Sequence, residues 1–128
     1  MAWYVDTSAF LKLLVTEEGS AALRSWYASQ DSLWSSHLLR TEALRAAARL
    51  GVEETVVEDA LDTVSLVLPS VATFATAGRI QPRDLRSIDA LHLATALEIG
   101  EDLEGVVTYD ERMIRAASVA DLHVVTPL

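Results

Sequence analysis

The 128-residue sequence contains no cysteine, which excludes disulfide bonds and thiolate metal ligands. Its first residues, Met-Ala-Trp-Tyr-Val-Asp, lack the basic segment and long apolar stretch of a signal peptide. No uncharged apolar run reaches the roughly 18–20 residues that span a bilayer. The segment Val64–Gly78 is too short and contains Pro69. These absences predict a soluble protein without a membrane span, in a reducing compartment such as the cytoplasm.

Positive charge is also scarce. Nine arginines and a single lysine, Lys12, stand against nineteen carboxylates, and the formal net charge is −9. Non-specific binding to nucleic acid usually depends on basic patches, so the overall charge argues against it. Either the substrate is not a polyanion, or a bound metal ion and a local group of arginines overcome the global field. Composition alone leaves both open.

Hydrophobic residues make up 51% of the chain and charged residues 23%, as expected for a compact domain spanning residues 1–128. Strands are expected at Ala2–Val5, Ser32–Ser36, Leu66–Leu68, Gly105–Thr108 and His123–Val125. Helices are expected at Ser8–Val15, continuing over Glu17–Gln30, then at Leu38–Leu50, Glu53–Val64, Ser70–Ala77, Ser87–Ile99 and Glu111–Ala117. The segment Gly78–Arg86 is typical of a loop. Strands alternating with helices predict an α/β/α sandwich with a central, mainly parallel sheet of four to five strands.

Four carboxylates interrupt segments that otherwise have the pattern of buried structure. They are Asp6, Glu42, Asp89 and Asp110. A carboxylate at the edge of apolar packing loses solvation, and this cost must be offset by hydrogen bonds, a cation or protonation. Taken singly, each aspartate is explained by capping of a helix start.

Glu42 is harder to explain as a local feature. It lies on or beside the apolar stripe of the helix at Leu38–Leu50, where Arg45 or Arg49 could pair with it. Asp6 and Asp110 directly follow strands, at the sheet edge where open parallel sheets bind ligands. Four gathered carboxylates repel one another and need a cation to remain ionised, and Mg²⁺ or Mn²⁺ suits an all-oxygen site.

Several neighbouring side chains are candidates for a supporting role. The hydroxyls of Ser8 and Thr108 are placed to orient a carboxylate or a metal-bound water, although a helix cap and an ordinary strand threonine explain them equally. Arg86, one turn before Asp89, is a candidate to contact phosphate or to pair with an acid, and an ordinary surface arginine is an equal alternative. His92, one turn after Asp89, invites a general-base role, but a packed histidine on a buried helix is the favoured interpretation.

The four acidic segments together resemble a known family. They are Val-Asp6-Thr-Ser-Ala-Phe, Thr-Glu42-Ala-Leu-Arg, Ile-Asp89-Ala-Leu-His-Leu-Ala-Thr-Ala and Val-Thr-Tyr-Asp110-Glu-Arg-Met. Their order and spacing resemble those of PIN-domain ribonucleases, and above all the VapC toxins of type II toxin–antitoxin pairs. The resemblance covers essentially the whole chain and implies a PIN-like fold and an Mg²⁺- or Mn²⁺-dependent endoribonuclease. It makes Asp6, Glu42, Asp89 and Asp110 the catalytic, metal-binding residues.

The resemblance also implies partners: RNA as substrate, a small cognate antitoxin, and a second copy of the chain in a homodimer. Apolar residues on the helices near Glu17–Gln30 and Glu53–Val64 are candidates for such contacts, or equally for the core. They are Leu23, Trp26, Tyr27, Val56 and Val57. The loop Gly78–Arg86 is a candidate for influencing which RNA is cut.

Other functions stay open at this point. Within the same fold, the alternatives are an RNA-processing nuclease without an antitoxin and a catalytically inactive binding module. A response-regulator receiver domain needs a late lysine, but the only lysine here is Lys12. A haloacid-dehalogenase-type phosphatase needs a second aspartate where this chain has Ser8. A P-loop enzyme is excluded because Gly-x-x-x-x-Gly-Lys does not occur.

Overall fold

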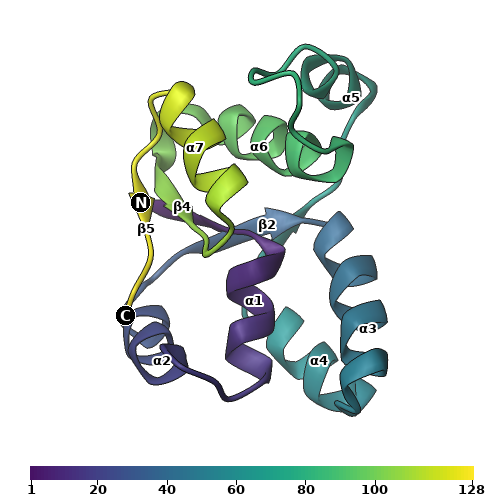
Figure 1. Ribbon diagram of the computed structural model, residues 1–128, viewed down its shortest axis with the longest axis vertical. Helices are drawn as coiled ribbons and strands as arrows, with labels where there is room; N and C mark the ends of the chain where they lie inside the picture. Colours follow the sequence, from purple (N-terminus) through teal and green to yellow (C-terminus); the bar gives the residue numbers. More distant parts are fainter.

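A computed structural model describes all 128 residues and shows a central sheet of five parallel strands in the order β3-β2-β1-β4-β5 (Figure 1). The strands are β1 (Ala2–Val5), β2 (Leu33–Ser36), β3 (Ser65–Val67), β4 (Leu103–Val107) and β5 (Val124–Val125). The predicted α/β architecture with a parallel sheet is confirmed. Because all strands run the same way, their carboxyl ends meet at one edge of the sheet.

Helices cover both faces of the sheet (Figure 1). One layer consists of α1 (Thr7–Leu14), α2 (Ser20–Ala28), α3 (Leu38–Leu50) and α4 (Glu54–Leu61); the other consists of α5 (Val71–Ala77), α6 (Ser87–Ile99) and α7 (Glu111–Val119), and a short 3-10 turn at Gly100–Asp102 follows α6. No helix of the structure has both the length and the apolar character that crossing a membrane requires.

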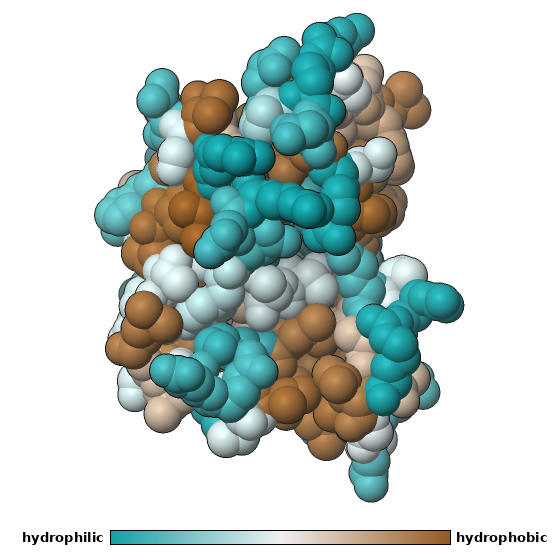
Figure 2. Space-filling view, viewed as in Figure 1, coloured by the Kyte–Doolittle hydropathy of each residue, from teal (hydrophilic) through white to brown (hydrophobic).

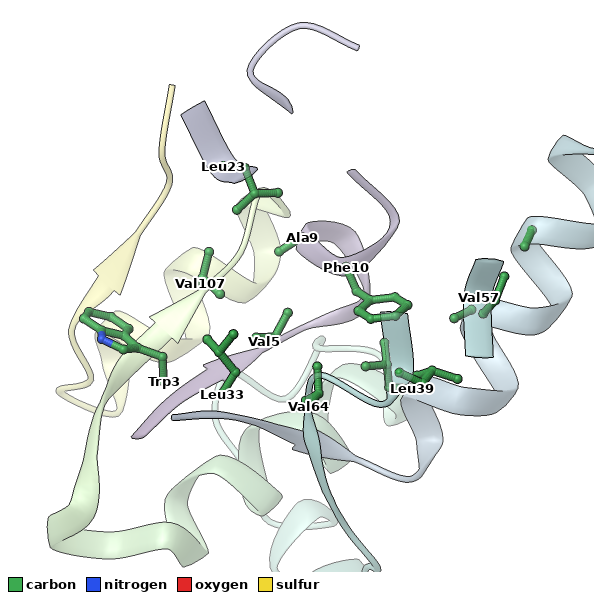
Figure 3. Close-up of a cluster of buried hydrophobic side chains, with 13 residues drawn as sticks. Trp3, Val5, Ala9, Phe10, Leu23, Leu33, Leu39, Val57, Val64 and Val107 are labelled. Carbon is green, nitrogen blue, oxygen red and sulfur yellow. The ribbon is translucent and has the colours of Figure 1, made fainter. Parts of the chain in front are cut away.

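The strand β1 supplies both halves of the core, because neighbouring side chains of a strand point to opposite faces. Trp3 and Val5 belong to the main apolar cluster, whereas Tyr4 packs with Ala96 and Val106 on the other face. Figure 3 shows the main cluster gathered between the sheet and the first helical layer. Complete burial of a side chain such as Val5 contributes about 1.5–3 kcal/mol, and Asp6 follows this last strand residue directly.

The predicted continuation of the first helix is wrong. The helix α1 ends at Leu14, and α2 starts only at Ser20 after Gly19, whose φ of 86° is a left-handed conformation that favours glycine. The hydroxyl of Ser20 donates to the carbonyl oxygens of Lys12 at 2.9 Å and Val15 at 3.2 Å, which closes the turn. The chain therefore folds back, and α2 lies beside α1 rather than extending it.

The structure also corrects the proposed contact residues. Leu23 and Val57 are completely buried members of the main cluster, so they are core and not surface. Trp26 and Tyr27 are partly buried against the same cluster. Of the five residues, Val56 alone is exposed, with 46% of its surface accessible.

Candidate active site

At the carboxyl edge of the sheet lies a cavity of about 160 Å³ without a single hydrophobic lining residue. It is lined by Asp6, Thr7, Ser8, Glu42, Arg86, Asp89, His92 and Asp110. All four predicted acids therefore reach one cavity, although they come from the β1–α1 junction, α3, α6 and the β4–α7 junction. Figure 2 shows hydrophilic side chains across the middle of the molecule, between the two helical layers. A larger cavity of about 460 Å³ lies near the amino ends of β1 and β2 and includes Trp34 and Ile99, but none of the four acids.

Asp6 is the most buried of the four acids, with 4% of its surface exposed. Its Oδ1 accepts hydrogen bonds from the Ala9 amide at 3.0 Å and the Ser8 hydroxyl at 2.7 Å, and its Oδ2 accepts from the Thr108 hydroxyl. Asp6 is thus the N-cap of α1, and its carboxylate also accepts hydrogen bonds from two side-chain hydroxyls. Burial raises the pKa of Asp6 above its ordinary value, against the opposing effect of these hydrogen bonds.

Asp89 and Asp110 share one guanidinium group. Arg86 Nε donates to Asp89 Oδ2 at 3.0 Å, and Arg86 Nη2 donates to Asp110 Oδ2 at 3.5 Å. Asp89 lies in the first turn of α6, and Asp110 caps α7 by accepting from the Arg112 amide. Of the alternatives for Arg86, pairing with an acid is the one present. Because its side chain is 62% exposed, the guanidinium is free to turn toward another anion.

Glu42 is held by two donors that meet on the same oxygen. Thr7 Oγ1 donates to Glu42 Oε1 at 2.8 Å, and His92 Nε2 lies 2.6 Å from that oxygen. Burial raises the pKa of Glu42, but the hydrogen bonds from His92 and Thr7 and the positive field of Arg86 leave it below its ordinary value. The expected partners Arg45 and Arg49 make no ion pair with Glu42, so that alternative is wrong.

Two lining residues were missed or undervalued in the sequence. The interpretation of His92 as a packed, buried histidine is right about its burial, since only 1% of its surface is exposed. That interpretation did not include the contact between His92 Nε2 and Glu42 Oε1. Thr7, which directly follows Asp6, lines the cavity but is absent from the residues predicted from the sequence. The available signal was spacing: His92 follows Asp89 by one helical turn, which places both on one face of α6.

Comparison with known proteins agrees with this geometry. Residues 3–119 match the family model of the PIN domain. Ribonuclease VapC46 of Mycobacterium tuberculosis is 38% identical over 127 residues, covering 98% of each chain. Ribonuclease VapC47 of the same species is 38% identical over 120 residues, covering 87% of this chain and 86% of the relative. The chain belongs to the VapC ribonucleases of the PIN-domain family.

Solved structures share the fold of this VapC chain. The crystal structure of Mycobacterium tuberculosis VapC20, described as a sarcin–ricin loop cleaving toxin, superposes with a TM-score of 0.77 at 18% identity, covering 98% of this chain and 99% of that one. A toxin–antitoxin complex from Klebsiella pneumoniae gives 0.75 at 22% identity, covering 100% of this chain and 98% of that one. At these identities the likeness establishes the α/β/α fold.

The donor set of the VapC cavity fits a hard divalent cation. Four carboxylates supply the oxygen ligands that Mg²⁺ and Mn²⁺ prefer, and no thiolate competes. In the arrangement described, no three of the acidic or histidine side chains converge to hold an ion. The contacts explain why: Glu42 is drawn to Thr7 and His92, and Arg86 holds Asp89 and Asp110.

Proposed function

We propose that this VapC ribonuclease is the toxin of a type II toxin–antitoxin pair, and that it hydrolyses phosphodiester bonds of RNA in the cytoplasm with Mg²⁺ or Mn²⁺. The observation that carries the proposal is the cavity at the carboxyl edge of the sheet, which is lined by four carboxylates and by no apolar side chain. The names of the relatives support the ribonuclease activity. The toxin–antitoxin complex among the structural neighbours supports the antitoxin partner.

In this proposal Asp6, Asp89 and Asp110 are the residues that would hold the ion, and Glu42 is either a further ligand or the group that orients the attacking water. When bound, the ion would supply Lewis-acid chemistry by acidifying water and offsetting the negative charge that develops at the phosphate. A nearby cation also favours the ionised form of Asp6, whose burial otherwise favours the protonated form.

Arg86 has a second role in the proposal. Its guanidinium pairs with Asp89 and Asp110, and its own side chain is 62% exposed where it lines the cavity. If Asp89 and Asp110 hold the metal ion instead of Arg86, the planar guanidinium can bind two oxygens of the scissile phosphate. In that way a chain with a net charge of −9 would present a local positive group to RNA. Ser8 and Thr108 would act through Asp6, which they hold in place.

We further propose that the chain forms a homodimer bound by a small antitoxin. The test is size-exclusion chromatography with light scattering on the chain alone and with the antitoxin, which we expect to be encoded directly beside it. A chain that stays monomeric and has no such neighbour would instead favour an RNA-processing nuclease.

The activity is tested by RNA cleavage in the presence of Mg²⁺ or Mn²⁺. The wild-type chain is compared with Asp6→Asn and Asp89→Asn, and with Asp62→Asn as a control on an exposed aspartate outside the cavity. We expect both site variants to lose cleavage and the control to keep it. Equal cleavage by all four proteins, or cleavage that persists in EDTA, would overturn the proposed metal-dependent mechanism.

A further inference from the structure

A buried chain of hydrogen bonds runs from the central strand to Glu42. The hydroxyl of Tyr4, on β1, lies 2.7 Å from His92 Nδ1, and His92 Nε2 lies 2.6 Å from Glu42 Oε1. Thr7 Oγ1 lies 3.2 Å from the same Nε2 and donates to the same carboxylate oxygen. Tyr4 and His92 are each 1% exposed, so this chain reaches the cavity from inside the protein.

The contacts determine where the proton of His92 resides. An ionised Glu42 can only accept hydrogen bonds, so Nε2 must carry a proton to approach Oε1 so closely. The lowered pKa of Glu42 keeps its carboxyl ionised at neutral pH. Burial raises the pKa of the Tyr4 hydroxyl, which therefore stays protonated and is hydrogen-bonded to Nδ1.

We propose that Tyr4 and His92 are positioning residues that fix the carboxylate of Glu42, with Oε1 bound to the protein and Oε2 directed to the attacking water or the ion. The inference rests on the proposed nuclease function and adds to it the source of Glu42's orientation. Both ring nitrogens of the buried His92 are paired, and the partner of Nε2 is a carboxylate that lines the cavity. Glu42 itself is 30% exposed on its side chain, so without these donors it would be free to rotate.

The two carboxylate oxygens of Glu42 have different surroundings. Both protein donors, Thr7 and His92, reach Oε1. Oε2 is left for the cavity that Glu42 lines with the three aspartates. Removing a residue that hydrogen-bonds to a metal-site carboxylate typically lowers metal affinity or activity by about 10–100-fold. The rigid core behind Tyr4 makes the orientation persistent, since β1 is paired on both sides.

The test compares His92→Leu, His92→Gln and Tyr4→Phe. Leucine removes the donor to Glu42, whereas the side-chain amide of glutamine can place a donor near the position of Nε2. Phenylalanine at position 4 keeps the ring and removes only the hydroxyl. Tyr27→Phe is the matched control, because it removes a hydroxyl bonded to Thr63, outside the cavity.

We expect His92→Leu to lower kcat for RNA cleavage about 10–100-fold with little change in KM, and His92→Gln to restore part of it. Tyr4→Phe should lower kcat by a smaller factor than His92→Leu does. Tyr27→Phe should leave kcat unchanged. Unchanged kcat in a folded His92→Leu, or no difference between the leucine and glutamine variants, would overturn the proposal.

A second readout is independent of activity and of folding of the leucine variant. Long-range ¹H–¹⁵N spectra of the wild-type imidazoles should show His92 protonated at Nε2, and Tyr4→Phe should shift the Nδ1 resonance, whose hydrogen-bond partner it removes. A wild-type His92 protonated at Nδ1 alone would overturn the positioning role even if RNA is cleaved. Wild-type protein that shows the expected tautomer but cleaves no RNA under any metal would refute the proposed function, while the structural half of the inference would stand.

Discussion

Thr108 at the end of β4 donates a hydrogen bond to Asp6 at the end of β1, although 102 residues separate them in the chain. The pairing of β1 with β4 places Val5 opposite Val107, so the residues that follow each strand emerge side by side. The sheet register therefore decides the environment of the most buried acid. A site built at the ends of paired strands is held by the backbone hydrogen bonds of the sheet as well as by its own contacts.

Replacing Thr108 with valine should destabilise the protein and misplace Asp6. The substitution keeps the shape but removes a donor to a buried carboxylate, which costs about 1–3 kcal/mol. The hydroxyl of Thr108 also accepts from the Asp110 amide at 3.1 Å, so two acids lose a contact. Urea denaturation measures the loss, with Thr55→Val on the exposed surface of α4 as the control. Equal stability of the two variants would show that the contact with Asp6 contributes little.

Replacing Arg86 with glutamine should have opposite effects on metal binding and on RNA cleavage. Removing the guanidinium frees Asp89 and Asp110 from their ion pairs with an exposed arginine, so Mn²⁺ should bind tighter by about fivefold. Cleavage should slow because the phosphate loses a bidentate partner. Isothermal titration with Mn²⁺ and steady-state cleavage separate the two effects. Arg24→Gln is the matched control, since Arg24 on α2 is exposed, makes no ion pair and lies outside the cavity. Weaker Mn²⁺ binding in Arg86→Gln would mean that the arginine organises the acids instead of competing for them.

Asp6 and Glu42 should contribute to stability with opposite dependence on pH. Burial raises the pKa of Asp6, so the folded state binds more protons than the unfolded state, and the stability due to Asp6 is lost as pH rises through its folded pKa. The lowered pKa of Glu42 has the reverse sign, and its contribution is lost as pH falls through its folded value. In metal-free buffer at pH 7, Asp6→Asn should therefore raise Tm and Glu42→Gln should lower it.

Thermal unfolding from pH 3 to pH 8 checks both signs. Each difference from wild type should shrink below about pH 4, where carboxyls become protonated in the unfolded chain. A Tm for Asp6→Asn below that of wild type at pH 7 would show that its hydrogen bonds outweigh the cost of burying its charge.

Much of the fold was predictable because it depends on local patterns. The apolar stripe that ends at Gly51 predicts α3 over Leu38–Leu50, and the structure has the same bounds. The apolar run after Ser87 predicts α6 in the same way. Asp6 and Asp110 could be placed at the carboxyl edge because each follows a strand and caps a helix. Their shared role in a metal site stays a prediction that rests on the motifs.

The contacts of Glu42 and the packing of α2 were decided only by the tertiary structure. His92 is 50 residues from Glu42 and 88 from Tyr4 in the chain, and periodicity describes one helix face without naming the element opposite it. The same limit applies to Leu23 and Val56: both are apolar on amphipathic helices, yet one is core and the other surface. The sequence by itself determined most of the helices and strands, and it placed Asp6 and Asp110 directly after strands. The order of the five strands and the packing of α6 across β1 decided which of those residues meet, since long-range contacts depend on how elements dock.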